Sequence, residues 1–270
     1  MSLRDLERKA RYLRRWVVEL IYAAKSGHLG GSLSIMDMLA ALYYGVIRVD
    51  PARPDWPGRD RFVLSKGHTA PALYAVLADK GFFSKEDLFD GYRRINSIFQ
   101  GHPDFKKTPG LDMSAGSLGV GLSAACGMAL GAARSGAGFL VYSIVGDGET
   151  NEGEIWEAAM FAAHHRLDNL TVMIDMNGMQ NDGPTRDVMD MGDMSEKWRS
   201  FGWSVRDVDG HSLADIQAAL RDASASRGRP GVLICRTIKG KGVSFMENNI
   251  HFHGAVPTRQ EYEAAMRELS

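Results

Sequence analysis

FLVYSIVGDGETNEGE, residues 139–154, joins an apolar run to a glycine turn and to the start of a helix. The run from Phe139 to Val145 is typical of a buried strand. Asn151 and Glu154 fit a capping box, which predicts a helix that extends to about Arg166. A strand, a glycine turn and a capped helix form half of a β-α-β unit, and such units build parallel sheets.

Strand and helix patterns alternate along the rest of the chain. Apolar runs predict further strands over Arg61–Ser65, Leu170–Asp175, Trp203–Val208 and Val232–Thr237. Helical periodicity covers Leu3–Lys25, Ser34–Tyr44, Ala70–Lys80, Gly121–Arg134, Leu213–Ala225 and a last helix from Thr258. Glycine-containing and polar segments predict loops over Ser26–Gly31, Gln100–Gly121, Met176–Asp193 and Lys239–Gly254. We therefore expect an α/β fold, a mostly parallel sheet flanked by helices, in a single domain over residues 1–270.

Charge and hydropathy narrow the classes of partner. The formal net charge is −1 and the isoelectric point is about 6.7, so neither a nucleic acid nor an anionic membrane is indicated. No apolar run approaches the roughly 20 residues that span a bilayer. Cys126 and Cys235 lie in separate apolar segments without metal-ligand spacing, which predicts core thiols in a reducing cytoplasm. We expect a cytoplasmic protein that acts on a small soluble substrate.

The ends of two predicted strands carry oxygen ligands. Asp147 follows the strand that ends at Val145, and Asn177 follows the strand that ends at Asp175. A Gly-Asp-Gly by itself is most often a simple turn. A carboxylate and a carboxamide at neighbouring strand ends, with the carbonyl of Met179, would supply part of the octahedron that Mg²⁺ prefers, and phosphate oxygens and water would supply the rest. Gly148 would let that anion approach the backbone.

A second glycine-rich loop, Gly116-Ser117-Leu118-Gly119-Val120-Gly121, opens a predicted helix. From Gly119 it matches a dinucleotide-binding pattern that ends at Ala124. That match is weak, because no strand pattern precedes it and no acidic residue lies at the ribose-binding distance. A loop that cradles phosphate or packs against backbone is more credible.

Five of the eight histidines lie in loops or beside glycines, namely His28, His68, His102, His251 and His253. A single such histidine is usually incidental. Several around one cleft could move protons on and off sugar hydroxyls near neutral pH. His251 and His253 could also be a metal pair, although no third ligand is nearby in the sequence. His164 and His165 are adjacent on a helix and are interpreted as structural or surface residues.

Glu152 and Glu157 begin the helix after the glycine turn. Negative charge is favourable at a helix N-terminus, so a purely structural role accounts for them at this point.

These motifs resemble those of the N-terminal, diphosphate-binding part of transketolase, and the resemblance covers nearly the whole chain. The matching stretches are Lys25–His28, Asp60–His68, Gly101–Pro103, Gly116–Gly121, Val145–Gly148 with Asn177, and His253–Gly254. The resemblance implies that thiamine diphosphate and Mg²⁺ bind here. It departs from the family at Leu29-Gly30-Gly31, where a proline commonly follows the first histidine, and in a short connection between Gly121 and Phe139.

The same resemblance implies a role for each candidate residue. Asp147, Asn177 and the Met179 carbonyl would hold magnesium, and Gly148, His68, His253 and the backbone of Gly116, Ser117 and Leu118 would contact the cofactor. His28, His102 and His253 would bind the sugar and move its protons. Glu152 and Glu157 match family acids that communicate between paired active sites.

The family also needs a pyrimidine-binding domain and a third domain, for which this chain has no sequence. The resemblance therefore implies a split enzyme, in which a separate C-terminal subunit supplies both domains and two such pairs form a heterotetramer. It would transfer a two-carbon ketol unit from a ketose to an aldose. Pentose phosphates, a branched sugar phosphate and a sulfonated sugar all stay open as substrates. The alternatives are another thiamine diphosphate enzyme, either deoxyxylulose-phosphate synthase-like or 2-oxo acid dehydrogenase E1 alpha-like, and a non-catalytic assembly protein.

Overall fold

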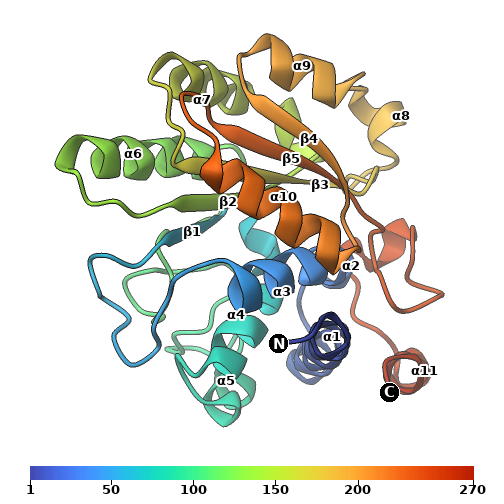
Figure 1. The fold of residues 1–270 in the computed structure, drawn as a ribbon. Coiled ribbons are helices and arrows are strands. Elements are labelled where there is room, and N and C mark those ends of the chain that lie inside the picture. Colours follow the sequence, from blue (N-terminus) through green and yellow to red (C-terminus); the bar gives the residue numbers. More distant parts are fainter.

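Five parallel strands form one sheet in the order β1-β2-β3-β5-β4 in a computed structural model that describes residues 1–270 (Figure 1). The strands are β1 (Arg61–Leu64), β2 (Val141–Gly146), β3 (Leu170–Met176), β4 (Ser204–Asp209) and β5 (Gly231–Arg236). All five expected strands are present, with ends within two residues of the predicted ones, and the predicted α/β class is confirmed. Gly146 of β2 pairs with Asp175 of β3, so the residues that follow these two strands emerge side by side.

Helices cover both faces of the sheet (Figure 1). They are α1 (Leu3–Ala24), α2 (Leu29–Ser34), α3 (Met36–Gly45), α4 (Ala70–Lys80), α5 (Lys85–Gly91), α6 (Val120–Ser135), α7 (Gly153–His164), α8 (Thr185–Met189), α9 (Met194–Ser200), α10 (Leu213–Ala225) and α11 (Arg259–Glu268). Three 3₁₀ turns, η1 (Gly67–Thr69), η2 (Gly148–Asn151) and η3 (Ile250–His253), complete the chain.

Two hydrophobic cores lie on opposite faces of the sheet, because successive side chains of a strand point to opposite sides. In β2, Tyr142 and Ile144 belong to the larger core with α1, α3, α4 and α10. Val141 and Val145 belong to the smaller core with α6, α7 and α9. The two cysteines are unpaired and buried, Cys235 in the larger core and Cys126 in the smaller, as core thiols should be.

The expected capping box before α7 is wrong. Glu152 is the N-cap and makes no side-chain capping bond, while Asn151 ends the 3₁₀ turn η2. The Asn151 amide instead contacts the Met191 sulfur and accepts a hydrogen bond from Gln180 at 2.7 Å. The Asn151 side chain, which the local pattern predicts as the helix cap, therefore contacts a distant loop instead. A capping box is present at α11, where the hydroxyl of Thr258 and the carboxylate of Glu261 satisfy each other's backbone amides.

Two predicted loops contain helices. The joint predicted over Ser26–Gly31 ends early, because α2 begins at Leu29. Gly31 allows α2 to pack closely, since a Cβ there would lie 2.9 Å from the Thr69 methyl carbon. The loop predicted over Met176–Asp193 contains α8, and the short helices α5 and α9 were not expected.

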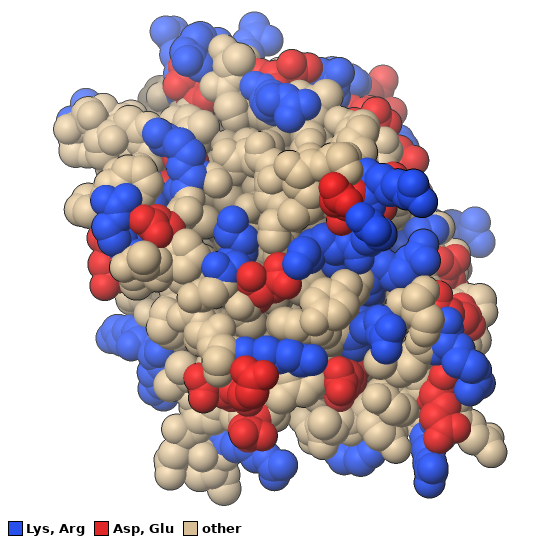
Figure 2. All heavy atoms as spheres, turned by 60° about the horizontal axis from the view of Figure 1, so that its bottom comes forward, with Lys and Arg blue, Asp and Glu red and all other residues tan.

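Figure 2 shows the molecule turned so that the bottom of Figure 1 faces the reader. On this face, charged side chains of both signs are interspersed. No helix combines the length and the apolar character needed to cross a bilayer.

Candidate active site

A cavity of about 320 Å³ lies at the carboxyl end of the sheet. Segments from β1, β2, β3 and β5 and from α2 and η3 contribute to its wall. Most of the predicted site residues line it, namely His28, His68, Gly116, Leu118, Asp147, Gly148, Asn177, Met179 and His253. His102 lies beyond the edge of the lining, with its ring centroid 6.4 Å from that of His28. Ser117 is exposed and does not line the cavity.

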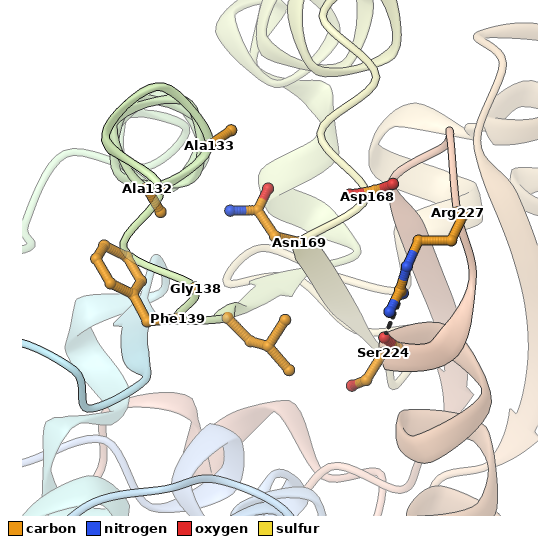
Figure 3. A pocket seen from close by; sticks show the side chains of 10 residues that line it. Ala132, Ala133, Gly138, Phe139, Asp168, Asn169, Ser224 and Arg227 are labelled. Atoms are coloured by element: carbon orange, nitrogen blue, oxygen red, sulfur yellow. Dashed lines mark hydrogen bonds between the residues drawn. The ribbon is translucent and has the colours of Figure 1, made fainter.

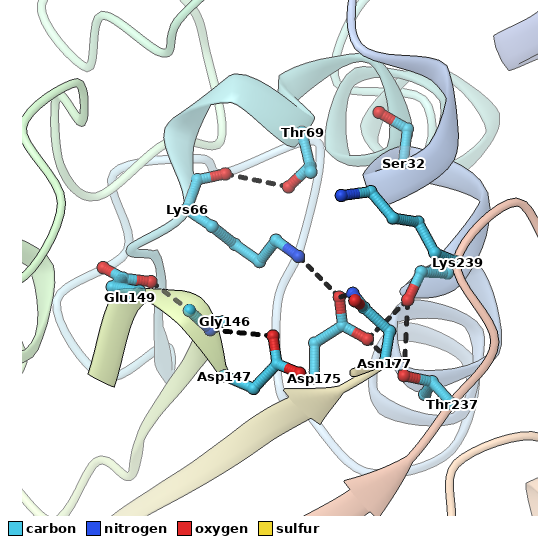
Figure 4. A network of polar contacts seen from close by, with 12 residues as sticks. Ser32, Lys66, Thr69, Gly146, Asp147, Glu149, Asp175, Asn177, Thr237 and Lys239 are labelled. Carbon is cyan, nitrogen blue, oxygen red and sulfur yellow. Dashed lines mark hydrogen bonds and ion pairs between the residues drawn. The ribbon is translucent and has the colours of Figure 1, made fainter. Parts of the chain in front are cut away.

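Asp175 forms the floor beneath this cavity and is completely buried. Its carboxylate accepts hydrogen bonds from Lys66, Ser34 and Thr237 at 2.5 Å each, and from the Asn177 amide at 2.9 Å (Figure 4). Burial by itself would raise the pKa of Asp175, but the Lys66 ammonium and these hydrogen bonds together hold it below its usual value. Asp175 is therefore an ionised carboxylate whose charge is fully engaged.

Asp147 is a second buried carboxylate without a cationic partner. Its oxygens accept from the backbone amides of Gly148 at 2.8 Å and Gly178 at 2.6 Å. Burial, and then the negative charge of Asp175, raise the pKa of Asp147 to about 6. An ionised Asp147 would thus be stabilised by a cation placed beside it.

Oxygen atoms of the kind that magnesium prefers gather next to Asp147. The Asn177 amide oxygen and the Met179 carbonyl follow the neighbouring strand, and Asn177 is oriented by donating to Asp175 and by accepting from the Met179 amide at 3.0 Å. Carboxylate, carboxamide and backbone carbonyl are a suitable donor set for a hard divalent cation. The residues present therefore fit the predicted metal.

The cavity wall next to these oxygen atoms is cationic. Lys239 is 2% exposed, and its ammonium donates to the Met179 and Gln180 carbonyls at 3.2 Å and contacts His253 Nδ1 at 2.8 Å. Burial, and then the charge of Lys66, lower the pKa of Lys239 to about 8. No carboxylate forms an ion pair with Lys239, so this wall suits a polyanion such as a diphosphate.

Three imidazoles face one another above this wall. The ring centroids of His28 and His68 are 5.2 Å apart, and His253 lies 5.6 Å from His28. Burial is the main reason that the pKa of His28 and of His253 falls to about 4, and burial also lowers that of His68 well below its usual range. The Nδ1 atom of His28 is buried without a protein partner. Neutral imidazoles that line a cavity can exchange protons with a ligand's hydroxyl groups.

The glycine-rich loop before α6 is tied to the β2 turn by Glu149. This carboxylate is 3% exposed and accepts from the Ser65 hydroxyl and from the Gly119 and Gly146 amides, both at 2.9 Å. Gly119 has a φ of +90°, and a Cβ at Gly121 would lie 2.4 Å from the Ser65 hydroxyl oxygen. Glycine is therefore required at position 119 by the backbone conformation and at position 121 by close packing. Gly116 lines the cavity, and a Cβ there would meet only open space. A dinucleotide-binding loop would follow a strand, and no strand precedes this one, so the structure does not support the weak dinucleotide-binding match.

Sequence reasoning did not single out Lys66, Glu149, Asp175 or Lys239. A usable signal existed for two of them, since Lys66 and Glu149 sit inside the motifs Ser-Lys-Gly-His and Gly-Asp-Gly-Glu.

Glu152 and Glu157 lie outside the cavity and are exposed. They share the outer surface of α6 and α7 with three exposed apolar side chains, Val120, Met160 and Phe161. His251 is exposed, and no group of three His, Cys, Asp or Glu side chains is placed to hold a metal, so the alternative metal pair at His251 and His253 lacks a third ligand.

A second hollow of about 320 Å³ lies at the opposite, amino-terminal end of the sheet (Figure 3). Phe139, Asn169 and Arg227 contribute to its wall. The Asn169 amide donates to the Ala129 carbonyl, and the Arg227 guanidinium donates to the carbonyls of Ser224 and Ser226. These donors are used within the chain, so the groups available for chemistry gather at the other end of the sheet.

Known proteins share both the sequence and the fold. The family model described as transketolase, thiamine diphosphate binding domain, matches residues 6–269. The chain is 46% identical over 265 residues to a 6-deoxy-6-sulfo-D-fructose transketolase subunit of Clostridium sp. (strain MSTE9), covering 98% of this chain and 96% of that protein. It is 43% identical over 270 residues to an apulose-4-phosphate transketolase subunit of Phocaeicola vulgatus, covering 100% of this chain and 95% of that protein.

The structure of transketolase from Campylobacter jejuni superposes with a TM-score of 0.93 at 29% identity, covering 100% of this chain and 43% of that one. The match extends over the whole sheet and the cavity at its carboxyl end. The family model names thiamine diphosphate as the ligand of this domain, and transketolases use it with a divalent metal. The cationic wall and the oxygen ligands of the cavity fit these two groups. The chain therefore belongs to the transketolase family and corresponds to its thiamine diphosphate-binding domain.

Proposed function

We propose that this chain is the diphosphate-binding subunit of a two-subunit transketolase, which transfers a two-carbon ketol unit from a ketose to an aldose. One observation carries the proposal. An unpaired buried carboxylate, Asp147, lies with Asn177 and the Met179 carbonyl next to the cationic wall around Lys239, whose ammonium donates to that carbonyl at 3.2 Å. This arrangement suits a magnesium diphosphate, in which the metal would take the place of the Lys239 ammonium at the Met179 carbonyl and the phosphate charge would pair with Lys239.

Asp147, Asn177 and the Met179 carbonyl would hold Mg²⁺. The diphosphate would contact Lys239, His68, His253, the Gly148 amide and the backbone of the loop that contains Gly116, Ser117 and Leu118. When bound, thiamine diphosphate supplies the electron sink for breaking and forming the sugar's carbon–carbon bond. Gly148 suits close backbone approach by the anion, and a Cβ there would lie 2.8 Å from the Gln180 side chain.

His28, His102 and His253 would bind the sugar and move its protons. The lowered pKa of each keeps it neutral at physiological pH, so it can accept a proton from one hydroxyl and return it to another atom.

A second polypeptide would complete the active site. The chain spans 96% and 95% of the two subunit relatives, but 43% of the full transketolase from Campylobacter jejuni. A separate C-terminal subunit would supply the remaining domains, among them the pyrimidine-binding one. We further propose a heterotetramer in which the outer surface of α6 and α7 packs against a second pair. Val120, Met160 and Phe161, exposed by 37%, 54% and 40%, would be covered there, and Glu152 and Glu157 would lie in that contact and communicate between the two active sites.

The substrate class is a sugar with an anionic group. The two relatives are named for a sulfonated ketose and for a branched sugar phosphate, and both chemistries are candidates here. A cytoplasmic location is the prediction that follows from the unpaired cysteines, and a single domain over residues 1–270 accords with two cores that share one sheet.

Capture of partners tests the proposal. The tagged chain, purified from its native lysate with thiamine diphosphate and Mg²⁺, should bring down a stoichiometric second chain. The complex should transfer a two-carbon unit from a ketose phosphate or a sulfonated ketose to an aldose acceptor, and it should not turn over without the acceptor. Recovery of this chain alone, or a complex that decarboxylates pyruvate instead, would contradict the proposal.

A further inference from the structure

We propose that His211 is a positioning residue, which fixes the backbone that carries Lys239 at the wall of the cavity. The inference rests on the proposed function, because it concerns how Lys239 is presented to the diphosphate. His211 lies behind the cavity, at the end of β4, and does not line it.

The hydrogen bonds of His211 define its tautomer. Its Nε2 atom accepts from the Ile238 backbone amide at 2.8 Å, and its Nδ1 atom lies 2.7 Å from the carboxylate of Asp37. Since a nitrogen that accepts from an amide carries no proton, the proton of the neutral ring is on Nδ1 and is donated to Asp37. The ring therefore connects one backbone donor to one carboxylate acceptor.

Asp37 is itself fixed. The guanidinium of Arg14 donates to both carboxylate oxygens, at 2.9 and 2.7 Å, and both residues are 6% exposed. A buried two-point ion pair between α1 and α3 is a rigid support. Through it, the first layer of helices is connected to the segment that follows β5.

The turn before His211 brings the two strand ends together. The Gly210 amide donates to the Arg236 carbonyl at 2.8 Å, and the His211 amide donates to Asp209 at 2.9 Å. A Cβ at Gly210 would lie 2.4 Å from the Thr237 methyl carbon, so only glycine allows this approach. The imidazole is thereby delivered directly to the Ile238 amide.

Several hydrogen bonds hold the segment from Thr237 to Gly240, among them one from the Asn248 amide to the Lys239 carbonyl at 2.9 Å. The Thr237 hydroxyl donates to Asp175 at 2.5 Å, and the Gly240 amide donates to the Gly30 carbonyl at 2.9 Å. The His211 bond to Ile238 lies between them and is adjacent to Lys239. It can be removed by a side-chain change that leaves the cavity wall untouched. Hydrogen bonds that orient metal ligands from behind, a comparable arrangement, contribute about 10- to 100-fold to metal affinity or activity.

Two amide variants separate positioning from simple core stability. In His211→Asn the side-chain amide can still donate to Asp37 from near the Nδ1 position, but nothing accepts from Ile238. In His211→Gln the amide oxygen reaches the Nε2 position and can accept from Ile238, but the donor to Asp37 is lost. If His211 only kept Asp37 paired, Asn would be the milder change. If it positions Lys239, Gln is the milder change.

The experiment measures binding of thiamine diphosphate at saturating Mg²⁺ to the complex of this chain with its partner, by titration calorimetry. We expect H211N to weaken binding by about tenfold and H211Q by less than about threefold, with kcat at saturating cofactor unchanged within about twofold. His164→Asn, a change at an exposed histidine on α7, is the control and should alter neither quantity. The opposite ranking of H211N and H211Q, or wild-type affinity in H211N, would overturn the inference.

Hydrogen exchange gives a readout that needs no cofactor. Exchange in the peptides that contain Ile238 should be faster in H211N than in wild type or H211Q, and equal rates would count against the anchor. If the wild-type complex does not bind thiamine diphosphate, the proposed function fails, and hydrogen exchange still decides whether His211 holds Ile238. If H211N does not fold, H211Q decides, since near wild-type affinity supports the inference and a tenfold loss contradicts it.

Discussion

Replacement of Lys66 by Met should destabilise the metal-free protein strongly. The ammonium of Lys66 lies 2.5 Å from Asp175, and the two side chains are 5% and 0% exposed. Removing one partner of a buried ion pair leaves an uncompensated charge and typically costs about 3–5 kcal/mol. The hydrogen bonds from Ser34, Thr237 and Asn177 to Asp175 remain, so we expect the lower part of that range, about 3 kcal/mol.

Thermal unfolding measures this cost. For a chain of this size, about 3 kcal/mol corresponds to a fall in Tm of roughly 6–12 °C. The control is Arg206→Met, which breaks an ion pair with Asp222 whose side chains are 53% and 63% exposed, and it should lower the free energy of unfolding by less than about 1 kcal/mol.

Acid and a second substitution identify the cause. Without Lys66 the pKa of Asp175 should rise, since its main stabilising charge is gone. The destabilisation is then largest at neutral pH and shrinks as acid protonates Asp175 in the folded state. Asp175→Asn added to Lys66→Met should recover part of the loss, because it removes the unpaired charge. A Tm of Lys66→Met within about 2 °C of wild type, or a deficit that does not shrink in acid, would refute this account of the floor.

Three further outcomes are expected. Asp147→Asn should abolish magnesium-dependent cofactor binding in titration calorimetry, because the proposed metal site would lose its one carboxylate ligand. Unchanged cofactor affinity would remove Asp147 from the metal site. His102→Asn should lower kcat more than about tenfold while cofactor affinity changes less than about threefold, and a collapse of affinity would show that the role is wrong. The metal-free protein should lose stability as the pH falls from about 6.5 towards 4. In this range His28 and His253 bind protons in the unfolded chain, but in the folded protein their pKa values of about 4 keep them neutral. Urea unfolding should show a smaller loss of stability in His253→Gln, and an equal loss would contradict the assignment.

The fold was predictable because local and global signals agree. The strand runs are continuous and apolar, as strands buried on both faces require, and α4 and α10 have the bounds that periodicity indicates. Predictions failed where a side chain has a distant partner. Asn151 does not cap α7 and instead accepts a hydrogen bond from Gln180, 29 residues away in the sequence. No local sequence pattern indicates that contact.

The site divides in the same way. Asp147, Asn177 and His68 could be predicted as candidates because they follow strands, and the carboxyl ends of parallel strands converge on one edge, where all three line the cavity. Lys66 and Asp175 are 109 residues apart, Ser65 and Glu149 are 84 apart, and Asp37 and His211 are 174 apart. Such pairs leave no periodic signal in the sequence. Lys66 and Glu149 could still have been suspected from the motifs that contain them, whereas the pairing of His211 with Asp37 is visible only in the folded chain.

Two carboxylates at the ends of adjacent strands have opposite environments, and this difference assigns their tasks. Gly146 and Asp175 pair in the sheet, which places Asp147 beside Asp175. Lys66 forms an ion pair with Asp175 and lowers its pKa, whereas Asp147 accepts only from uncharged donors, the Gly148 and Gly178 amides and the Thr185 hydroxyl, and its pKa rises. If Lys66 paired with Asp147 instead, the metal would have to displace two buried ammonium groups, that of Lys66 and that of Lys239 at the Met179 carbonyl. Because Lys66 is paired with Asp175, Asp147 has no cationic partner of its own, and a divalent cation beside it would stabilise its ionised form.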